Sequence, residues 1–433
     1  MSKKVSFYNL GCKVNLADIS RIGKQFEELG HSIVDFEEES DIVLINTCTV
    51  THRADADCRK IVRKALRKSP DAFVGVLGCF AQLSPDEVIK INGVDAVFGQ
   101  KEKYNIPELI GNFNKSEKAQ VLVGNMEDIP FHTSAVSDNT GRTRAVFKIQ
   151  DGCEYNCTFC TIPMARGGFR SMNFNEITSH IDNFVSEGYN EVILSGINLG
   201  EYNSFNGEKF VDVVRLLDEY PADIRYRISS IEPNLLKQEI IDIIENSKKF
   251  VQHFHIPLQS GSQDILMKMK RRYRIKNYDK LINDIKTRMP DTCLGADVIV
   301  GFPGETEERF QETYDFINSS PISYLHVFTY SERKGTVAAD LEGVVPHDIR
   351  KERTRILREL SENKLNEFYN SQIGKIKEVL PETYNPEYDQ WKGHSDNYVN
   401  VVFSGKNISK GQKIKVLLTK NNRNYVEGTV LNG

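Results

Sequence analysis

Short hydrophobic runs alternate with amphipathic, helix-length stretches from residue 1 to about residue 110. The strand-like runs occupy residues 5–10, 32–36, 41–47, 73–78 and 95–99. This alternation is typical of a parallel sheet whose strands are joined by crossover helices. We therefore predict an N-terminal parallel α/β domain over residues 1–112. Residues 113–138 mix charge, Ser, Asn and Gly with a weak strand signal near Val121, and we interpret them as a connector.

A second series of strand and helix patterns follows the connector. Its strands are expected at residues 145–150, 191–197, 224–231, 251–258, 295–302 and 323–330. Six such units are too few for a complete eight-stranded barrel, so the pattern predicts a partial (β/α)6 barrel over residues 139–370. Residues 371–433 change to short strands separated by turn residues, which predicts a small all-β barrel. The fold class is therefore α/β with a C-terminal β domain.

Composition and charge narrow the class of protein. The chain of 433 residues has 56 Lys and Arg against 60 Asp and Glu, a net charge of −4, which excludes a globally basic nucleic-acid binder. A hydrophobic content of 39% is typical of folded globular domains. No apolar run approaches the roughly 20 residues of a membrane-spanning helix, and the first residues lack the apolar core of a signal peptide. We expect a cytosolic protein without a membrane partner.

Three cysteines lie close together on a loop after the first strand of the second series. Cys153, Cys157 and Cys160 form a Cys-x3-Cys-x2-Cys pattern. Zinc is one possible occupant, but zinc sites usually have four ligands and no fourth Cys or His follows within this loop. Three thiolates instead suit a 4Fe-4S cluster with one open iron, which can bind the amino and carboxylate groups of a methionine-type ligand.

The N-terminal domain carries a second group of cysteines. Cys12, Cys48 and Cys79 each follow a predicted strand, and such positions meet at the carboxyl edge of a parallel sheet. We interpret them as a second three-cysteine cluster site, with buried core cysteines as the alternative. Cys58 lies on the apolar stripe of a predicted helix, and Cys293 begins a predicted strand, so both are expected to be structural.

The three-cysteine loop after the first barrel strand resembles that of the radical S-adenosylmethionine enzymes. The resemblance implies that the loop cysteines are catalytic and that further cofactor contacts come from later strand ends. In this chain the matching positions lie in "LSGIN", "SSIEP", "PLQSG" and "VGFPGE". They are Ser195, Gly196, Asn198, Ser230, Glu232, Gln259, Gly301 and Gly304.

The N-terminal trio, the loop and the final barrel together make the whole chain similar to the methylthiotransferases. The resemblance implies two 4Fe-4S clusters, S-adenosylmethionine, a C-terminal RNA-binding TRAM domain, and an electron donor such as flavodoxin or ferredoxin. "NTCTVTHRADADCRK" and "FKIQDGCEYNCTFCTIPMARGGFRS" look most like the subfamily acting on threonylcarbamoyladenosine of tRNA. That subfamily inserts sulfur at carbon 2 of the modified adenosine beside the anticodon and methylates it. Two other subfamilies, acting on isopentenyladenosine of tRNA or on a ribosomal protein aspartate, remain alternatives.

Local basic patches agree with an RNA substrate, here the anticodon stem-loop. Cations recur on one face of the helix expected after Cys48, and others lie in the final barrel beside Tyr398, Phe403 and Tyr425. Arg166 and Arg170 follow the cysteine loop, where they are expected to orient the substrate. The candidate substrate contacts are Lys60, Arg63, Lys64, Arg67, Arg166, Arg170, Lys413 and Lys415.

A protein of another class, a non-catalytic iron-sulfur carrier or redox-sensing RNA-binding protein, would share the cysteines. It would not consume S-adenosylmethionine, so formation of 5′-deoxyadenosine separates the two readings. The carrier interpretation also leaves the strand-end motifs of the second domain unexplained.

Overall fold

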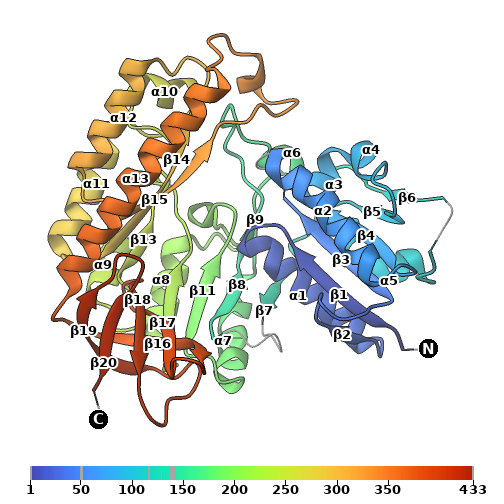
Figure 1. Cartoon of the computed structure of the whole chain (residues 1–433), viewed down its shortest axis with the longest axis horizontal. Coiled ribbons are helices and arrows are strands. Elements are labelled where there is room, and N and C mark those ends of the chain that lie inside the picture. The colour runs from blue at the N-terminus through green and yellow to red at the C-terminus, as the bar shows by residue number, and fades with distance from the viewer. Residues whose placement is uncertain (1, 49–51, 116–117, 128, 137–142, 432–433) are drawn as a thin grey trace.

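The computed structural model describes residues 2–48, 52–115, 118–127, 129–136 and 143–431. Two α/β units stand side by side, and a small β-barrel lies beneath the larger of them (Figure 1). None of the helices described in these ranges is long and apolar enough to cross a membrane.

The N-terminal unit is a six-stranded, fully parallel sheet in the order β2-β1-β3-β4-β5-β6. The strands are β1 (Lys4–Asn9), β2 (Ser32–Val34), β3 (Ile42–Thr47), β4 (Phe73–Gly78), β5 (Ala96–Phe98) and β6 (Gln120–Leu122). The helices are α1 (Lys13–Glu28), α2 (His52–Lys68), α3 (Cys79–Leu83), α4 (Pro85–Val88) and α5 (Ile106–Ile110), with the 3-10 turn η1 (Glu102–Tyr104). Both sheet faces are covered by apolar side chains, which is why β3 and β4 are buried throughout. The parallel α/β prediction is confirmed, and β6 adds a strand inside the stretch interpreted as a connector.

The second unit is an open barrel of six parallel strands. They are β8 (Ala145–Lys148), β11 (Glu191–Ser195), β12 (Arg225–Ile228), β13 (His253–His255), β14 (Cys293–Val300) and β15 (Tyr324–Thr329). Backbone hydrogen bonds join Tyr226 of β12 to Lys249 and Val251, which carries the sheet across to β13. The short strand β7 (Ser134–Val136) pairs antiparallel with β8. The predicted partial barrel is confirmed.

Helices cover the outside of this barrel, and their apolar faces form the largest core of the protein. They are α7 (Ile177–Ser186), α8 (Phe210–Glu219), α9 (Gln238–Asn246), α10 (Gln263–Lys268), α11 (Ile275–Arg288), α12 (Glu307–Ser319) and α13 (His347–Gln372). The cysteine loop lies between β9 (Gln150–Asp151) and α6 (Ile162–Arg166), and β10 (Arg170–Ser171) pairs with β9 to close its base.

The C-terminal unit is a closed barrel in the order β16-β17-β18-β20-β19. Its strands are β16 (Ile376–Asn385), β17 (Gln390–Ser395), β18 (Asn400–Ser404), β19 (Ile414–Asn421) and β20 (Val426–Val430). The sequence pattern suggested one continuous stretch near residues 393–403, but a turn separates β17 from β18. At this turn Tyr398 adopts a φ of 71° and its N–H donates to the Ser395 carbonyl.

Candidate active site

The three loop cysteines lie at the carboxyl end of the barrel, where nitrogen donors surround their sulfur atoms. The Tyr155 N–H donates to Cys153 Sγ at 3.3 Å, and the Asn198 amide lies 3.9 Å from the same atom. Arg271 Nη1 donates to Cys157 Sγ at 3.2 Å. Hydrogen bonds to sulfur are one of the means by which a protein adjusts a ligated iron-sulfur cluster. The donor set therefore fits a three-thiolate cluster.

Burial keeps these thiols protonated when no metal is bound. It raises the pKa of Cys153 and Cys157 above the ordinary thiol value, and it raises the pKa of Cys160 to about 12. The Arg271 charge opposes the rise at Cys157. Since a metal binds thiolates, loading the site must release these protons.

Several of the strand-end residues expected to contact the cofactor gather around this loop. Glu232 forms an ion pair with Arg271, the residue that contacts Cys157. The side-chain oxygen of Gln150 accepts a hydrogen bond from the backbone N–H of Asn198 at 2.8 Å. The side-chain amide of Gln150 donates to the Gly152 carbonyl at 2.7 Å. A Cβ at Gly196 would lie only 2.8 Å from that Gln150 oxygen, so glycine is required for this bridge.

A cavity of about 210 Å³ opens beside Cys160, and its apolar lining includes Phe159, Ile299 and Phe328. Gln259, which follows β13, also lines the cavity and has a φ of 64°. Its backbone N–H donates to the Asp297 carbonyl of β14, and its carbonyl accepts from the Ile299 N–H. A non-glycine residue in this left-handed conformation is uncommon and is characteristic of functional sites. Gln259 therefore lies against this cavity, and its contact with the cofactor stays a prediction.

The remaining strand-end positions are not among the residues that line the cavity. Ser195 is buried at the end of β11, and Ser230 follows β12. A side chain at Gly301 would meet Arg350 of α13, and one at Gly304 would meet Lys268. Cofactor contact by Ser195, Ser230 and the two glycines stays a prediction.

The N-terminal cysteines follow three neighbouring parallel strands. Cys12 caps the start of α1 after β1, Cys48 follows β3, and Cys79 begins α3 after β4. Because the sheet order is β1-β3-β4, the three residues lie along one carboxyl edge. Burial raises the pKa of the Cys79 thiol, the nearby Cys12 charge raises it further, and Arg166 opposes the rise. Cys58 and Cys293 are buried in cores, which confirms their structural interpretation.

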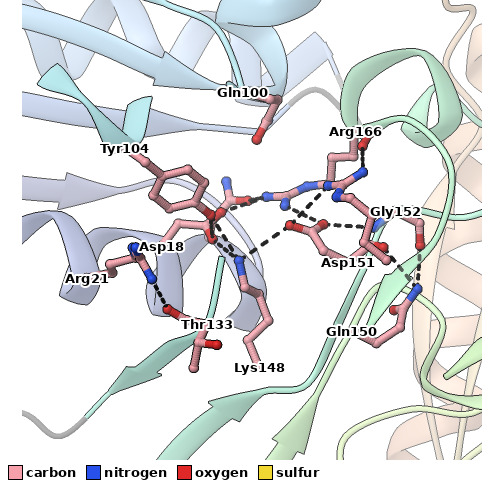
Figure 2. A network of polar contacts seen from close by, with 12 residues as sticks. Asp18, Arg21, Gln100, Tyr104, Thr133, Lys148, Gln150, Asp151, Gly152 and Arg166 are labelled. Atoms are coloured by element: carbon pink, nitrogen blue, oxygen red, sulfur yellow. Dashed lines mark hydrogen bonds and ion pairs between the residues drawn. The ribbon is translucent and has the colours of Figure 1, made fainter. Parts of the chain in front are cut away.

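The two cysteine groups lie at the junction of the two α/β units, because α3, which begins at Cys79, packs against α6, which follows Cys160. Asp18 of α1 lies at the centre of a buried polar network in this junction (Figure 2). Its carboxylate contacts Lys103 Nζ at 2.5 Å, Lys148 Nζ at 2.6 Å and Arg166 Nη2 at 3.2 Å. The Tyr104 hydroxyl donates to Asp18 at 2.5 Å. These contacts tie α1 and η1 to the base of the cysteine loop.

Arg166 occupies a different place from the one expected for a substrate contact. Its side chain is 1% exposed, pairs with Asp151 at 2.8 Å and also bonds Asn15. Arg170 is 16% exposed and donates to the Arg166 and Gly168 carbonyls. The structure therefore gives Arg166 a positioning role between the cysteine groups, and a substrate contact by Arg170 stays a prediction.

The predicted basic face of α2 is partly neutralised by a residue outside the helix. Glu37 forms ion pairs with Lys64 and with Lys68, the latter at 3.0 Å. Lys60 pairs with Asp57 at 3.2 Å. Arg63 and Arg67 are exposed and form no ion pair with any residue in the described ranges.

The two lysines predicted to bind RNA in the C-terminal barrel also differ in whether they already form an ion pair. Lys413 pairs with Asp223 at 2.5 Å, at a hollow of about 390 Å³ between the barrel and the core, whereas Lys415 is exposed. Phe403 is buried in the barrel core, and Tyr398 packs on His253 with ring centroids 4.4 Å apart. The expectation that Phe403 faces RNA is therefore wrong, because this ring fills the barrel core. Tyr398 is partly buried at the domain junction, and its contact with RNA stays a prediction.

Sequence reasoning missed Arg271 and the junction network. Arg271 lies far along the chain from the cysteines and belongs to no recognisable motif. Lys103 and Lys148 resemble ordinary surface lysines in sequence, and only their placement opposite Asp18 distinguishes them.

Two family models match the chain. The model described as the radical SAM superfamily matches residues 147–317, which include the loop cysteines. The model described as uncharacterized protein family UPF0004 matches residues 4–99, which include Cys12, Cys48 and Cys79.

Curated relatives match over nearly the full length. The threonylcarbamoyladenosine tRNA methylthiotransferase MtaB of Bacillus subtilis is 39% identical and covers 98% of this chain and 95% of its own. The MtaB of Aquifex aeolicus is 35% identical, covering 96% of this chain and 100% of its own. The tRNA-2-methylthio-N(6)-dimethylallyladenosine synthase of Fusobacterium nucleatum is 34% identical, covering 96% and 97%.

Solved structures support the fold. The radical S-adenosylmethionine methyltransferase TsrM from Kitasatospora setae superimposes with a TM-score of 0.55 at 15% identity, covering 76% of this chain and 73% of its own. With both cysteine groups at strand ends and relatives matched from end to end, the chain belongs to the radical SAM tRNA methylthiotransferases of the MtaB type.

Proposed function

We propose that this enzyme methylthiolates carbon 2 of N6-threonylcarbamoyladenosine beside the tRNA anticodon, giving 2-methylthio-N6-threonylcarbamoyladenosine. Four curated MtaB relatives, at 32–39% identity, support this substrate. The cofactors of the family are two 4Fe-4S clusters and S-adenosylmethionine. Flavodoxin or ferredoxin is our proposed electron donor, and the cytosol our proposed location.

The observation that carries the proposal is the packing of α3 against α6, which brings the two cysteine groups to one junction. We assign Cys153, Cys157 and Cys160 to the cluster that binds S-adenosylmethionine, and Cys12, Cys48 and Cys79 to the auxiliary cluster. When bound, the loop cluster and S-adenosylmethionine would supply a carbon radical able to take the hydrogen from carbon 2. The auxiliary cluster would supply the sulfur, and a second S-adenosylmethionine its methyl group.

The chain's own residues position the reactants and exclude water. Gln150 and Gly196 fix the loop on the strand ends, and Arg271 holds Glu232 beside Cys157. Phe159, Ile299 and Phe328 give the neighbouring cavity an apolar wall. Such a wall protects a carbon radical from water and from polar side chains.

Nucleoside mass spectrometry tests the reaction. The anaerobically reconstituted enzyme is incubated with threonylcarbamoylated tRNA, S-adenosylmethionine, sulfide and a reductant. The methylthiolated nucleoside is expected. If 5′-deoxyadenosine forms without it, the radical chemistry stands and the substrate assignment fails. Isopentenyladenosine tRNA and the ribosomal protein are then the next substrates to examine.

Removing a cysteine of the N-terminal trio is expected to separate sulfur insertion from radical formation. In a Cys79→Ala variant, the loop site keeps its three thiolates, so 5′-deoxyadenosine should still form while methylthiolated product falls to background. Iron analysis and electron paramagnetic resonance should show one cluster instead of two. A Cys58→Ala variant is the control, since that buried cysteine lies in a core. Unchanged product from Cys79→Ala would contradict the assignment.

We expect Arg63 and Arg67 to contribute more to tRNA binding than Lys64 and Lys68, which already pair with Glu37. Each phosphate contact adds roughly 0.7 to 0.9 to the slope of log affinity against log salt. An Arg63→Gln, Arg67→Gln variant should therefore lower that slope by about 1.5 and weaken binding at low salt. The matched control is Lys64→Gln, Lys68→Gln, with a smaller expected change. Equal effects of the two variants in filter binding would show that the ion pairs do not matter.

A further inference from the structure

Two histidines and an aspartate meet on the inner face of the open barrel, apart from the six cysteines assigned to the clusters. Side chains alternate along a strand, so residues paired across neighbouring parallel strands share a face. Asp297 of β14 pairs with His326 of β15, and His255 of β13 pairs with Gly295, two residues before Asp297. Three neighbouring strands therefore direct these side chains to one place.

The ligand atoms of the three side chains have the spacing found around a bound metal ion. Oδ1 of Asp297 lies 3.0 Å from Nε2 of His255 and 3.3 Å from Nδ1 of His326. All three atoms lie within 4.8 Å of one another. Zinc binds nitrogen and oxygen at about 2.0–2.2 Å, so neighbouring ligand atoms of a tetrahedral or octahedral ion are about 2.8–3.6 Å apart. Both distances from Asp297 fall within this range.

The chemistry of the three groups suits a divalent transition metal. Two imidazoles and one carboxylate hold zinc in some hydrolytic enzymes and ferrous iron in oxygenases. In the alternative arrangement, both imidazoles donate hydrogen bonds to Asp297. The 3.3 Å separation between Asp297 and His326 is longer than the usual range of about 2.7–3.2 Å for such a bond. A shared ion accounts for both contacts of the carboxylate.

The tyrosine beside the site can orient one of the two rings. The Tyr324 hydroxyl lies 3.4 Å from Nδ1 of His255, the nitrogen that a metal at Nε2 leaves free. Metal-binding histidines usually bond an outer partner through this second nitrogen. Arg227, whose charge acts on Tyr324, already pairs with Glu191 at 2.8 Å. The surroundings therefore supply an outer partner for the ring, and the nearby arginine has a carboxylate of its own.

The site is accessible from one side. The side chain of His255 is 8% exposed, whereas those of Asp297 and His326 are 25% and 56% exposed. Asp297 also lines the cavity beside Cys160. An ion can therefore enter from the inside of the barrel. Three protein ligands would leave it at least one position for an oxygen ligand from that side, as in catalytic zinc sites.

We infer that His255, Asp297 and His326 bind one divalent transition-metal ion, separate from the two iron-sulfur clusters. Its ligand atoms are Nε2 of His255, Oδ1 of Asp297 and Nδ1 of His326. The ion lies at the wall of the cavity and takes water, or an oxygen atom of a molecule in the cavity, as a further ligand. This inference does not depend on the identity of the substrate, so it can fail while the proposed function holds.

Zinc binding by the holoenzyme tests the inference. Enzyme with both clusters intact is equilibrated anaerobically with micromolar zinc chloride, desalted and analysed for metal by mass spectrometry. The wild-type chain is expected to retain one zinc ion. In competition with a chromophoric chelator, a His326→Ala variant should bind zinc at least about 100-fold more weakly, since losing even an outer partner of a metal ligand costs about 10–100-fold. A His347→Ala variant, at the exposed start of α13, is the matched control and should bind zinc like the wild type.

The ligands of the bound zinc separate this site from the cysteines. X-ray absorption should show nitrogen and oxygen at about 2.0–2.2 Å, whereas cysteine sulfur would lie at about 2.3 Å. An Asp297→Asn variant should also lose the ion and keep the electron paramagnetic resonance signals of both clusters. The inference is overturned if wild-type enzyme retains no zinc, if the His326→Ala variant binds zinc as tightly as wild type, or if the zinc has sulfur ligands.

Discussion

A Cys157→Ala variant is expected to form no 5′-deoxyadenosine above background and no methylthiolated nucleoside. Cys157 is buried, and Arg271 donates to its sulfur at 3.2 Å. Without this thiolate the loop offers two ligands, too few for the cluster that leaves one iron open for S-adenosylmethionine. High-performance liquid chromatography of 5′-deoxyadenosine after anaerobic turnover measures the loss.

A second buried cysteine, Cys293, provides the control for the Cys157→Ala variant. Cys293 is also buried but lies in the core between α13 and the C-terminal barrel, so the Cys293→Ala variant should cleave S-adenosylmethionine at nearly the wild-type rate. The variant lacking Cys157 should retain the auxiliary cluster and its electron paramagnetic resonance signal. Formation of 5′-deoxyadenosine by that variant would refute the assignment of the loop.

The sequence predicted the partial barrel and the placement of the cysteines at strand ends well, because both depend on local signals. Cys153, Cys157 and Cys160 are close in the chain, and Cys12, Cys48 and Cys79 each follow a strand that hydrophobicity reveals. Parallel topology then places strand ends together without any knowledge of side-chain contacts.

Contacts that depend on the register between distant strands could not be predicted in this way. His255, Asp297 and His326 become neighbours only once β13, β14 and β15 are paired residue by residue. Glu37, on the loop after β2, forms ion pairs with Lys64 and Lys68 of α2. The charge pattern of the helix alone therefore predicted more unpaired cations than the structure has. The burial of the Phe403 ring likewise depends on the closure of the C-terminal barrel around it.

The largest expected loss of stability follows from replacing Asp18 with Asn. Asp18 is fully buried and accepts from Lys103, Lys148 and Arg166, so the variant leaves three buried cations with Asp151 as their remaining acid. Removing one partner of a buried ion pair typically costs about 3–5 kcal/mol. Because the network joins α1 to β8, the junction between the two α/β units should open first. The midpoint of the first urea transition should fall, and hydrogen exchange should speed up in both elements.

Two comparisons make this prediction specific to the buried network. A Glu352→Gln variant removes an exposed ion pair with Arg355 and should lower the free energy of unfolding far less than Asp18→Asn. Lys148 and Arg166 hold the pKa of Asp151 below its usual range, and with Lys103 they do the same for Asp18. Carboxylates with a lowered folded-state pKa stabilise the fold above the unfolded-state pKa of about 3.9 and lose that contribution as pH falls below it. Wild-type stability should therefore drop in acid, and the Asp18→Asn variant should drop less steeply; equal slopes would place the acid sensitivity elsewhere.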